Sequence, residues 1–239
     1  ASTTYTPRRT IAFNVIWVLT MASYFSAWCT DPGLVPEKWR AFEHTLAESS
    51  ERIWQPGLAT TCSKCNLVRP ERAHHCSICE QCVMRMDHHC PWIGNCVGSG
   101  NHKCFILFAL YCASVSIIFT MSNFPLMRIL LSSSLSWSPP DCPLNHFFFV
   151  FLLLFPALFA LLLSCLTTSH ICLMLQNRTT IETDYAGLSP YDIGFLGNST
   201  QLLGPPSFKW LLPIPWKEDD LHGTGYPYME PLLDPTEEP

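Results

Sequence analysis

Charged residues are scarce in this 239-residue sequence, where Asp, Glu, Lys and Arg together make up 14% of the chain. An ordinary soluble domain carries about 25%, so the sequence lacks the charged surface of a soluble protein of its size. The mean hydropathy of +0.17 agrees with that shortage. The net charge is −5 and the sequence contains no basic cluster, which argues against a nucleic-acid partner.

Three stretches contain no charged residue at all: Thr10–Thr30, Cys104–Met127 and Cys142–Asn177. Each is at least as long as the roughly 20 residues that a helix needs to cross a bilayer core. The most apolar parts of these stretches predict three transmembrane helices, over Ile11–Cys29, Phe105–Ser122 and Phe147–Thr167. A soluble protein would need further apolar chain to bury three such helices, and this sequence has none.

Positive residues are unevenly distributed around the predicted spans. Eight lie between the first and the second span, namely Lys38, Arg40, Arg52, Lys64, Arg69, Arg72, Arg85 and Lys103. One, Arg128, follows the second span. Because Lys and Arg favour cytoplasmic loops, we expect the long loop and the chain after Asn177 to be cytosolic, although Arg8 and Arg9 oppose this orientation. The glycosylation sequons at Asn177 and Asn198 would then be chance matches.

Cysteine is abundant, with 13 residues, seven of which lie between Cys62 and Cys96. In a reducing cytosolic loop, cysteines bind metal more often than they form disulfides. The pattern C-x2-C-x9-H-x6-C occurs twice, first as Cys62, Cys65, His75 and Cys82, then as Cys76, Cys79, His89 and Cys96. Each set is typical of a structural zinc site. We predict two zinc ions that hold short hairpins, with an exchange of Cys79 and Cys82 between the sets as an open alternative.

One cysteine of the loop has no place in either set. Cys90 corresponds to Cys76 in the repeat, but Ile93 stands where the second cysteine of the pair would be. A free thiol close to His88 and Asp87 is the arrangement that nucleophilic catalysis requires, because the imidazole accepts the thiol proton and the carboxylate orients the imidazole. We therefore predict that Cys90 is a nucleophile.

The run Asp87-His88-His89-Cys90 within this cysteine frame resembles the DHHC protein S-acyltransferases, also called palmitoyltransferases. Further motifs carry the resemblance: DPG at Asp31–Gly33, TTxE at Thr179–Glu182 and a less distinct C-terminal element at Asn198–Trp216. The resemblance implies a polytopic α-helical membrane protein with a cytosolic, cysteine-rich zinc-binding domain of short hairpins. The family usually has four transmembrane helices. The three visible here would start with its second, and a further helix would lie upstream of Ala1.

The resemblance also implies an activity and the residues that perform it. Cys90 would carry the acyl group, Asp87 and His88 would activate it, and Thr180 would support Asp87 by a hydrogen bond. The second histidine, His89, would be a zinc ligand, as the repeat predicts independently. The enzyme would transfer a long-chain fatty acyl group, such as palmitoyl, from acyl-CoA to cysteine thiols of membrane-associated substrate proteins.

Three further residues are candidates for contacts with acyl-CoA and the bilayer. Arg69 and Arg72 would bind the CoA phosphates. The alternative is that they only contribute to the positive charge of the cytosolic loop. Trp92 is expected at the membrane interface, where the acyl chain would enter the space among the helices. We expect an integral protein of the endoplasmic reticulum, the Golgi or the plasma membrane, with the zinc domain in the cytosol.

The sequence divides into six segments: a span at 1–30, a linker with the DPG motif at 31–61, the zinc domain at 62–105, two spans at 106–177, the TTxE and C-terminal elements at 178–216, and an acidic tail at 217–239. The tail holds seven acids and many prolines, so we expect it to be disordered.

The alternative function is a membrane-tethered zinc-binding interaction module without acyltransferase activity, such as a ring-type ubiquitin ligase or a truncated, inactive form. A ring-type domain predicts a second terminal CxxC pair, which is absent after Cys82, and leaves Cys90 unexplained. A transporter is disfavoured because the predicted spans contain no ionisable residue other than histidine.

Overall fold

The computed structural model describes residues 7–35, 60–134, 143–184 and 189–216. Most of the predicted linker and the whole acidic tail lie outside the described residues. The chain forms two compact units. The first comprises Ala1–Ala22 and Ile106–His170, and the second comprises Ser23–Phe105 and Ile171–Pro239.

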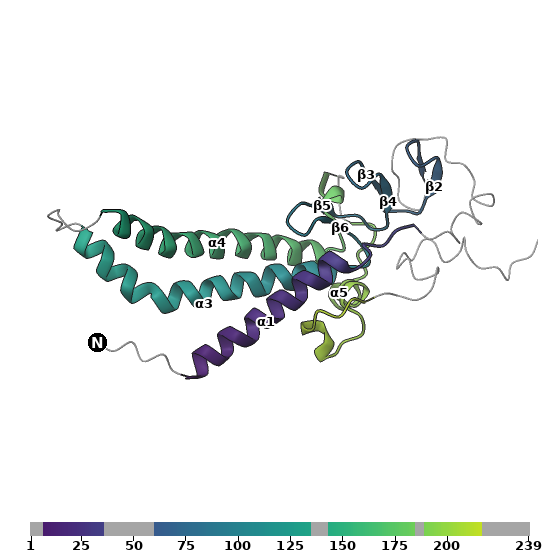
Figure 1. Cartoon of the computed structure of the whole chain (residues 1–239). Helices are drawn as coiled ribbons and strands as arrows, with labels where there is room; N and C mark the ends of the chain where they lie inside the picture. Colours follow the sequence, from purple (N-terminus) through teal and green to yellow (C-terminus); the bar gives the residue numbers. More distant parts are fainter. Residues whose placement is uncertain (1–6, 36–59, 135–142, 185–188, 217–239) are drawn as a thin grey trace, which may run out of the picture. The chain divides into compact units, whose positions relative to one another are not determined.

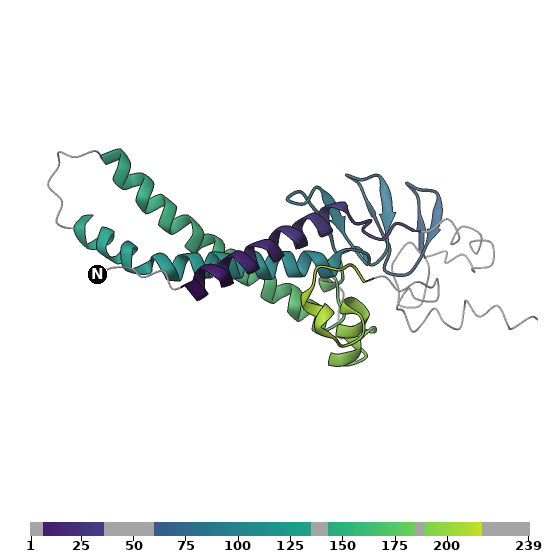
Figure 2. The same cartoon turned by 60° about the horizontal axis from the view of Figure 1, so that its bottom comes forward.

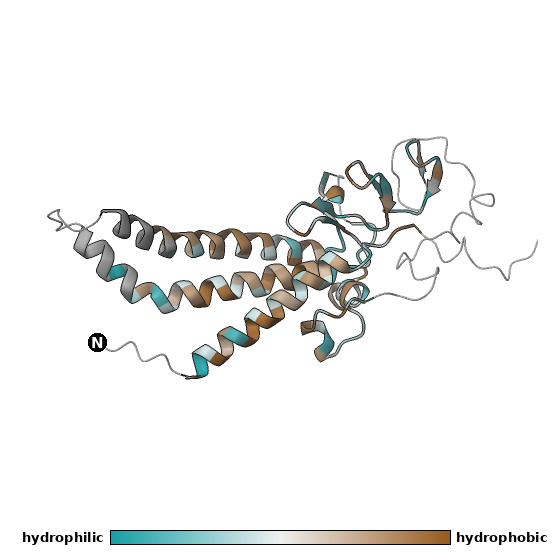
Figure 3. Cartoon of the chain, viewed as in Figure 1, coloured by the Kyte–Doolittle hydropathy of each residue, from teal (hydrophilic) through white to brown (hydrophobic). Residues whose placement is uncertain are grey.

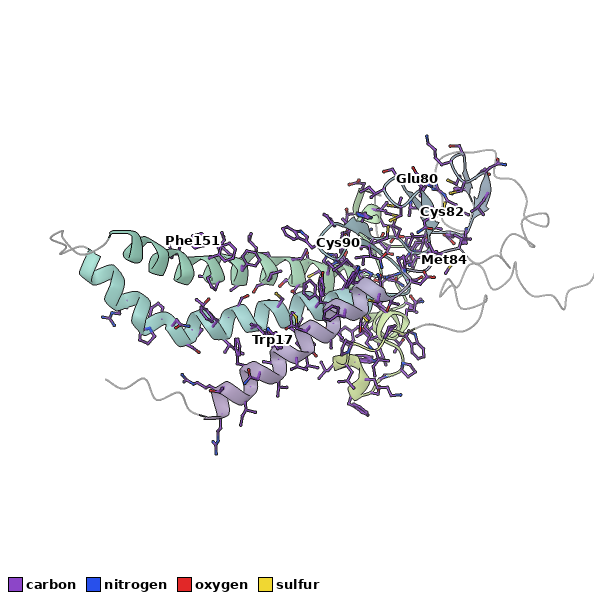
Figure 4. All side chains as sticks on the ribbon, viewed as in Figure 1. Trp17, Glu80, Cys82, Met84, Cys90 and Phe151 are labelled. Atoms are coloured by element: carbon purple, nitrogen blue, oxygen red, sulfur yellow. The ribbon has the colours of Figure 1, made fainter. Side chains whose placement is uncertain are left out.

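The uncharged stretches form three long helices, α1 (Pro7–Cys29), α3 (His102–Ser134) and α4 (Pro143–Leu175) (Figure 1). Each contains a segment long and apolar enough to cross a membrane, over Arg8–Cys29, His102–Pro125 and Leu154–Leu175. Figure 3 shows hydrophobic residues along most of these helices. Large apolar side chains such as Trp17 and Phe151 are about half exposed, at 49% and 50% (Figure 4). Lipid-facing helices expose such side chains because lipid, unlike water, is an apolar surrounding. The prediction of three transmembrane helices is confirmed.

Three antiparallel hairpins make up the cysteine-rich segment of the second unit (Figure 2). The paired strands are β1 (Thr60–Cys62) with β2 (Leu67–Arg69), β3 (His74–Cys76) with β4 (Gln81–Val83), and β5 (His88–Cys90) with β6 (Asn95–Val97). The last turn residue of each hairpin has left-handed backbone geometry, with φ of 47° at Asn66, 56° at Glu80 and 59° at Gly94. Strand pairs this short are not stable by themselves, so other bonds must hold them.

The junction after α1 is fixed by the DPG motif. Asp31 accepts hydrogen bonds through Oδ1 from the backbone N–H groups of Gly33, at 2.8 Å, and Leu34, at 2.9 Å. The backbone then lies directly against the turn after β6, where the N–H of Gly100 donates to the carbonyl of Pro32 at 3.1 Å. A Cβ on Gly100 would lie 2.2 Å from the carbonyl oxygen of Asp31. Only glycine fits this position.

Replacing Gly100 by alanine is therefore expected to destabilise the second unit. Overpacking against a rigid backbone costs about 1–3 kcal/mol, which lowers the melting temperature by roughly 2–10 °C for a chain of this size. Thermal unfolding of purified Gly100→Ala in detergent measures the change. Gly94→Asn is the matched control, because a Cβ there meets no atom within 4 Å and asparagine tolerates its left-handed backbone. Equal shifts in both variants would contradict the packing argument.

The chain after α4 contains η2 (Ile181–Asp184), α5 (Phe195–Leu203) and η3 (Phe208–Leu211). Asn198 anchors this part, since its Nδ2 donates to the carbonyl of Leu175 and to Asp192 Oδ1, both at 2.7 Å. Asn198 and Asn177, the asparagines of the two sequons, are each 1% exposed. Their burial supports the interpretation of the sequons as chance matches, because a glycan needs an exposed asparagine.

Candidate active site and metal centres

The first Cys3His cluster consists of Cys62, Cys65, His75 and Cys82, whose ligand atoms all lie within 4.8 Å of one another. Cys65 Sγ is 3.2 Å from His75 Nδ1 and 3.6 Å from Cys82 Sγ. The two halves of the cluster come from different hairpins. Cys62 ends β1 and Cys65 lies in the β1–β2 turn, while His75 and Cys82 are cross-strand partners of β3 and β4.

The second Cys3His cluster repeats this arrangement one hairpin further along, with Cys76, Cys79, His89 and Cys96. His89 Nδ1 lies 3.6 Å from Cys76 Sγ, 3.4 Å from Cys79 Sγ and 3.6 Å from Cys96 Sγ. His89 and Cys96 are cross-strand partners of β5 and β6. The two sets thus interleave as the repeat predicts, because the middle hairpin contributes to both. Cys79 belongs to the second cluster, and Cys82, which lies on β4, belongs to the first. Figure 4 labels Cys82 in the hairpin segment.

The donor atoms of both clusters lie 3.2–3.6 Å apart, which is close to the spacing around a zinc ion. A tetrahedral zinc ion with bonds of about 2.3 Å to sulfur and about 2.0 Å to nitrogen places its donors roughly 3.5–3.8 Å apart. Backbone N–H groups also point at two of the sulfurs, from Cys65 to Cys62 at 3.5 Å and from Cys79 to Cys76 at 3.4 Å. Such hydrogen bonds favour thiolates, which are the form that binds metal. The thiols of both clusters are free of disulfides.

Cys90 lies in the third hairpin at the position that Cys62 and Cys76 occupy in the first two. The backbone N–H groups of Trp92 and Ile93 lie close enough to lower the pKa of its thiol. The residues two and three positions after Cys62 and Cys76 act on those thiols in the same way. Ile93 is 1% exposed and fills the place of the second cysteine. The third hairpin therefore repeats the metal-binding turn around a sulfur that has no metal partner.

His88 connects this sulfur to an acid. Its Nδ1 is 2.7 Å from Asp87 Oδ2, and its ring also bonds Cys90. Burial lowers the pKa of His88, but the hydrogen bonds and charges of Asp87 and Cys90 outweigh it and raise the pKa to about 9. Burial also opposes ionisation of Cys90, yet the bonds from His88 and the backbone N–H groups lower the pKa of the thiol. Both shifts favour an imidazolium beside a thiolate.

Asp87 is 1% exposed and is held by the TTxE segment. Thr180 donates its hydroxyl to Oδ2 at 2.8 Å and its backbone N–H to Oδ1 at 2.9 Å. The hydrogen bond that the resemblance implies is thus present, together with a second one from the backbone. With His88 as the third donor, the carboxylate is fixed in one orientation.

The TTxE segment contains the glutamate half of a capping box, in which a glutamate bonds the backbone N–H three residues before it. Glu182 Oε2 accepts the N–H of Thr179 at 2.9 Å. The same carboxylate forms a two-point ion pair with Arg72, at 2.6 Å from Nε to Oε1 and 2.7 Å from Nη2 to Oε2. Burial raises the pKa of Glu182, but the hydrogen bonds and charge of Arg72 outweigh it and lower the pKa.

This pairing contradicts the assignment of Arg72 to the CoA phosphates. Arg72 is 1% exposed, and its guanidinium also donates to Oδ1 and to the carbonyl of Asn177, both at 3.0 Å. The charge is neutralised inside the protein, so it serves neither a phosphate nor the general charge of the loop. Arg69 is partly exposed and donates from Nε to Thr60 at 2.6 Å. Trp92 is 82% exposed.

Sequence reasoning assigned no role to three residues that shape this site. Phe105 places its ring 5.1 Å from the ring of His88, edge to face. Asn101 is fully buried and joins Ala27 at the end of α1 to the strand β6, donating to the carbonyls of Ala27 at 3.0 Å and Cys96 at 2.8 Å. Glu182 could have been found, because Thr179-x-x-Glu182 is the sequence pattern of a capping box. No local pattern indicates the other two contacts.

Asp87, His88 and Cys90 lie together on a cysteine-rich hairpin domain, in a chain with three candidate membrane helices. This combination indicates a membrane-bound enzyme. The family model of the DHHC palmitoyltransferases matches residues 56–185. "Probable protein S-acyltransferase 12" of Arabidopsis thaliana is 34% identical, over 90% of this chain and 77% of its own length. "Probable protein S-acyltransferase 13" of the same plant is 33% identical, over 87% and 72%. "Palmitoyltransferase ZDHHC20-B" of Danio rerio is 34% identical, over 75% and 55%. The chain belongs to the DHHC palmitoyltransferase family of enzymes.

Proposed function

We propose that the protein is a protein S-acyltransferase that works through an acyl thioester on Cys90. Its donor would be a long-chain fatty acyl-CoA such as palmitoyl-CoA, and its acceptors cysteine thiols of membrane-associated proteins. One observation carries the proposal: His88 bonds Cys90 and lies with Nδ1 2.7 Å from the buried Asp87. A zinc-binding interaction module would have no use for this arrangement.

In the first half-reaction, His88 takes the proton of the Cys90 thiol, and the sulfur attacks the carbonyl carbon of the acyl-CoA thioester. A carbon–sulfur bond to Cys90 forms as the bond to CoA breaks. The CoA sulfur leaves and takes the proton back from His88. Asp87 stays ionised throughout and accepts the hydrogen bond from Nδ1, which keeps the other ring nitrogen directed at the sulfur.

In the second half-reaction, a substrate cysteine gives its proton to His88 and attacks the thioester on Cys90. The acyl group moves to the substrate sulfur, and Cys90 leaves as a thiolate that recovers the proton. Each half-reaction exchanges one thioester for another, so neither needs an energy source. The rate depends on proximity and on the thiolate fraction.

We propose the two Cys3His clusters as the ligands of two structural zinc ions. Bound zinc would supply cross-links between neighbouring hairpins, which these short strands need in order to fold. Four protein donors for each ion leave no open position at which a substrate could be activated. Residues 62–105 would thus form the zinc domain, and residues 178–216 the element that supports its catalytic hairpin.

The remaining proposed roles concern contacts with the acyl-CoA donor and with the membrane. Arg69 stays our candidate for the CoA phosphates, because it is partly exposed and a guanidinium pairs well with phosphate. Trp92, exposed beside Cys90, suits the membrane interface. The acyl chain would stay in the apolar phase, since each buried CH2 contributes about 0.8 kcal/mol. We propose a cytosolic orientation of the zinc domain in the endoplasmic reticulum, the Golgi or the plasma membrane.

Mapping the acyl group on the purified full chain tests this function. The chain is incubated with an alkyne-bearing palmitoyl-CoA, digested, and its labelled peptide identified by mass spectrometry. We expect the label on the peptide that contains Cys90 and its release by neutral hydroxylamine, which cleaves thioesters. A label confined to exposed cysteines such as Cys165 and Cys172 would contradict the proposal.

A further inference from the structure

The carboxylate that orients His88 is connected to a buried ion pair that lies outside the reacting groups. Asp87 is held by Thr180, and Thr180 lies in the turn that Glu182 closes by accepting the N–H of Thr179 at 2.9 Å. Arg72 in turn fixes both oxygens of Glu182, at 2.6 and 2.7 Å. Hydrogen bonds, joined by the peptide bond between Thr179 and Thr180, therefore connect Arg72 to the carboxylate that orients His88.

The surroundings leave this ion pair little freedom. Glu182 is 3% exposed, and the guanidinium of Arg72 lies 4.1 Å from the centre of the Tyr191 ring. The backbone of Arg72 has a φ of 60°, an uncommon value for a residue other than glycine. Such a conformation persists only where the surroundings determine it strongly, and such residues are enriched at functional sites. Four hydrogen bonds and the ring contact hold the Arg72 side chain in place.

Stability alone is a poor explanation for such a pair. Desolvation of two charges consumes most of their attraction, so well-packed apolar residues often stabilise a protein as much as a buried ion pair does. Apolar residues could not, however, fix the direction of the Thr179 N–H and thereby the position of Thr180. A two-point guanidinium–carboxylate pair fixes direction in a way that a lysine cannot.

We infer that Arg72 and Glu182 are positioning residues for acyl transfer, which hold Thr180 against Asp87 and so keep His88 directed at Cys90. The inference deepens the proposed function and rests on it. Neither residue touches the reacting atoms. Their loss should therefore slow the formation of the acyl-enzyme without weakening the binding of acyl-CoA.

Glu182→Gln tests the inference in the full chain, because glutamine keeps the shape but has one oxygen, so it cannot accept from Arg72 Nε as well as from Arg72 Nη2 and the Thr179 N–H. At saturating acyl-CoA we expect single-turnover acylation of Cys90 to slow by about 10–100-fold, with the half-saturating concentration changed less than about threefold. Arg72→Lys is expected to behave alike. Tyr191→Phe is the matched control: it removes a buried hydrogen bond from Tyr191 to Glu71 that does not reach the turn. Its rate should stay within about threefold of wild type.

The effect of Glu182→Gln is then compared in the wild-type chain and in a chain that already carries Asp87→Asn. If the pair acts through Asp87, adding Glu182→Gln to Asp87→Asn should slow acylation by less than about twofold. An equal slowing in both backgrounds would overturn the inference, and so would wild-type rates in Glu182→Gln and Arg72→Lys. Loss of zinc from both variants, with zinc retained in Tyr191→Phe, would assign the pair to folding and also overturn it. Failure of the wild-type chain to acylate would instead contradict the proposed function.

Discussion

Cys90→Ser is expected to abolish the acyl-enzyme. The serine hydroxyl has a pKa far above that of the thiol, and the two backbone N–H groups and His88 that lower the pKa of Cys90 cannot make it ionise near neutral pH. Labelling with an alkyne fatty acyl-CoA should fall to background, at least about 1,000-fold below wild type. In-gel fluorescence with and without hydroxylamine measures the loss.

Cys172→Ser is the matched control for this experiment, because Cys172 is an exposed free thiol outside the hairpins. It should label like the wild type. Both variants should also keep their zinc, since neither residue belongs to a Cys3His cluster. Wild-type labelling of Cys90→Ser would show that the acyl group is carried elsewhere.

The repeat in the sequence explains why this nucleophile could be predicted. Spacing alone separated Cys90 from the six cysteines of the two metal sets, and the structure adds the reason for the repeat. Each set takes two cysteines from one turn and a cross-strand pair, such as His89 and Cys96, from the next hairpin. A period of one hairpin therefore appears in the sequence as a fixed ligand spacing. The third turn keeps the same backbone hydrogen bonds, but Ile93 takes the place of the second thiol.

The contacts that support Asp87 could not be predicted from residue spacing in the sequence. Arg72 and Glu182 are 110 residues apart in the chain, and nothing local in either segment indicates the other. The composition of the loop even favoured another interpretation of Arg72, because positive residues are common in cytosolic loops and at phosphate sites. The burial of Arg72 in the structure argues against that interpretation. Long-range pairing of polar groups depends on the tertiary fold, whereas ligand spacing and apolar runs depend on local periodicity.

Removal of the bound metal should have the second largest effect on acylation of Cys90. The hairpin segment has strands of three residues and a small apolar cluster around Val83 and Cys96, so it lacks the core to fold without cross-links. Purified protein is expected to contain two zinc ions per chain, one for each Cys3His cluster. Chelation of both should unfold the domain and end acylation. Elemental analysis together with circular dichroism and acylation measures this.

Single-ligand variants distinguish the two centres, because only the second holds the catalytic hairpin. Cys96→Ser removes a ligand on β6, directly opposite the strand of Cys90, and should slow acylation by about 100-fold or more. Cys62→Ser breaks the first cluster, which joins β1 and β2 to the middle hairpin, and should slow it distinctly less. Each variant is expected to retain one zinc. If Cys62→Ser lost both ions, or if wild-type protein held fewer than two, the interleaved arrangement of two independent four-ligand sites would be wrong.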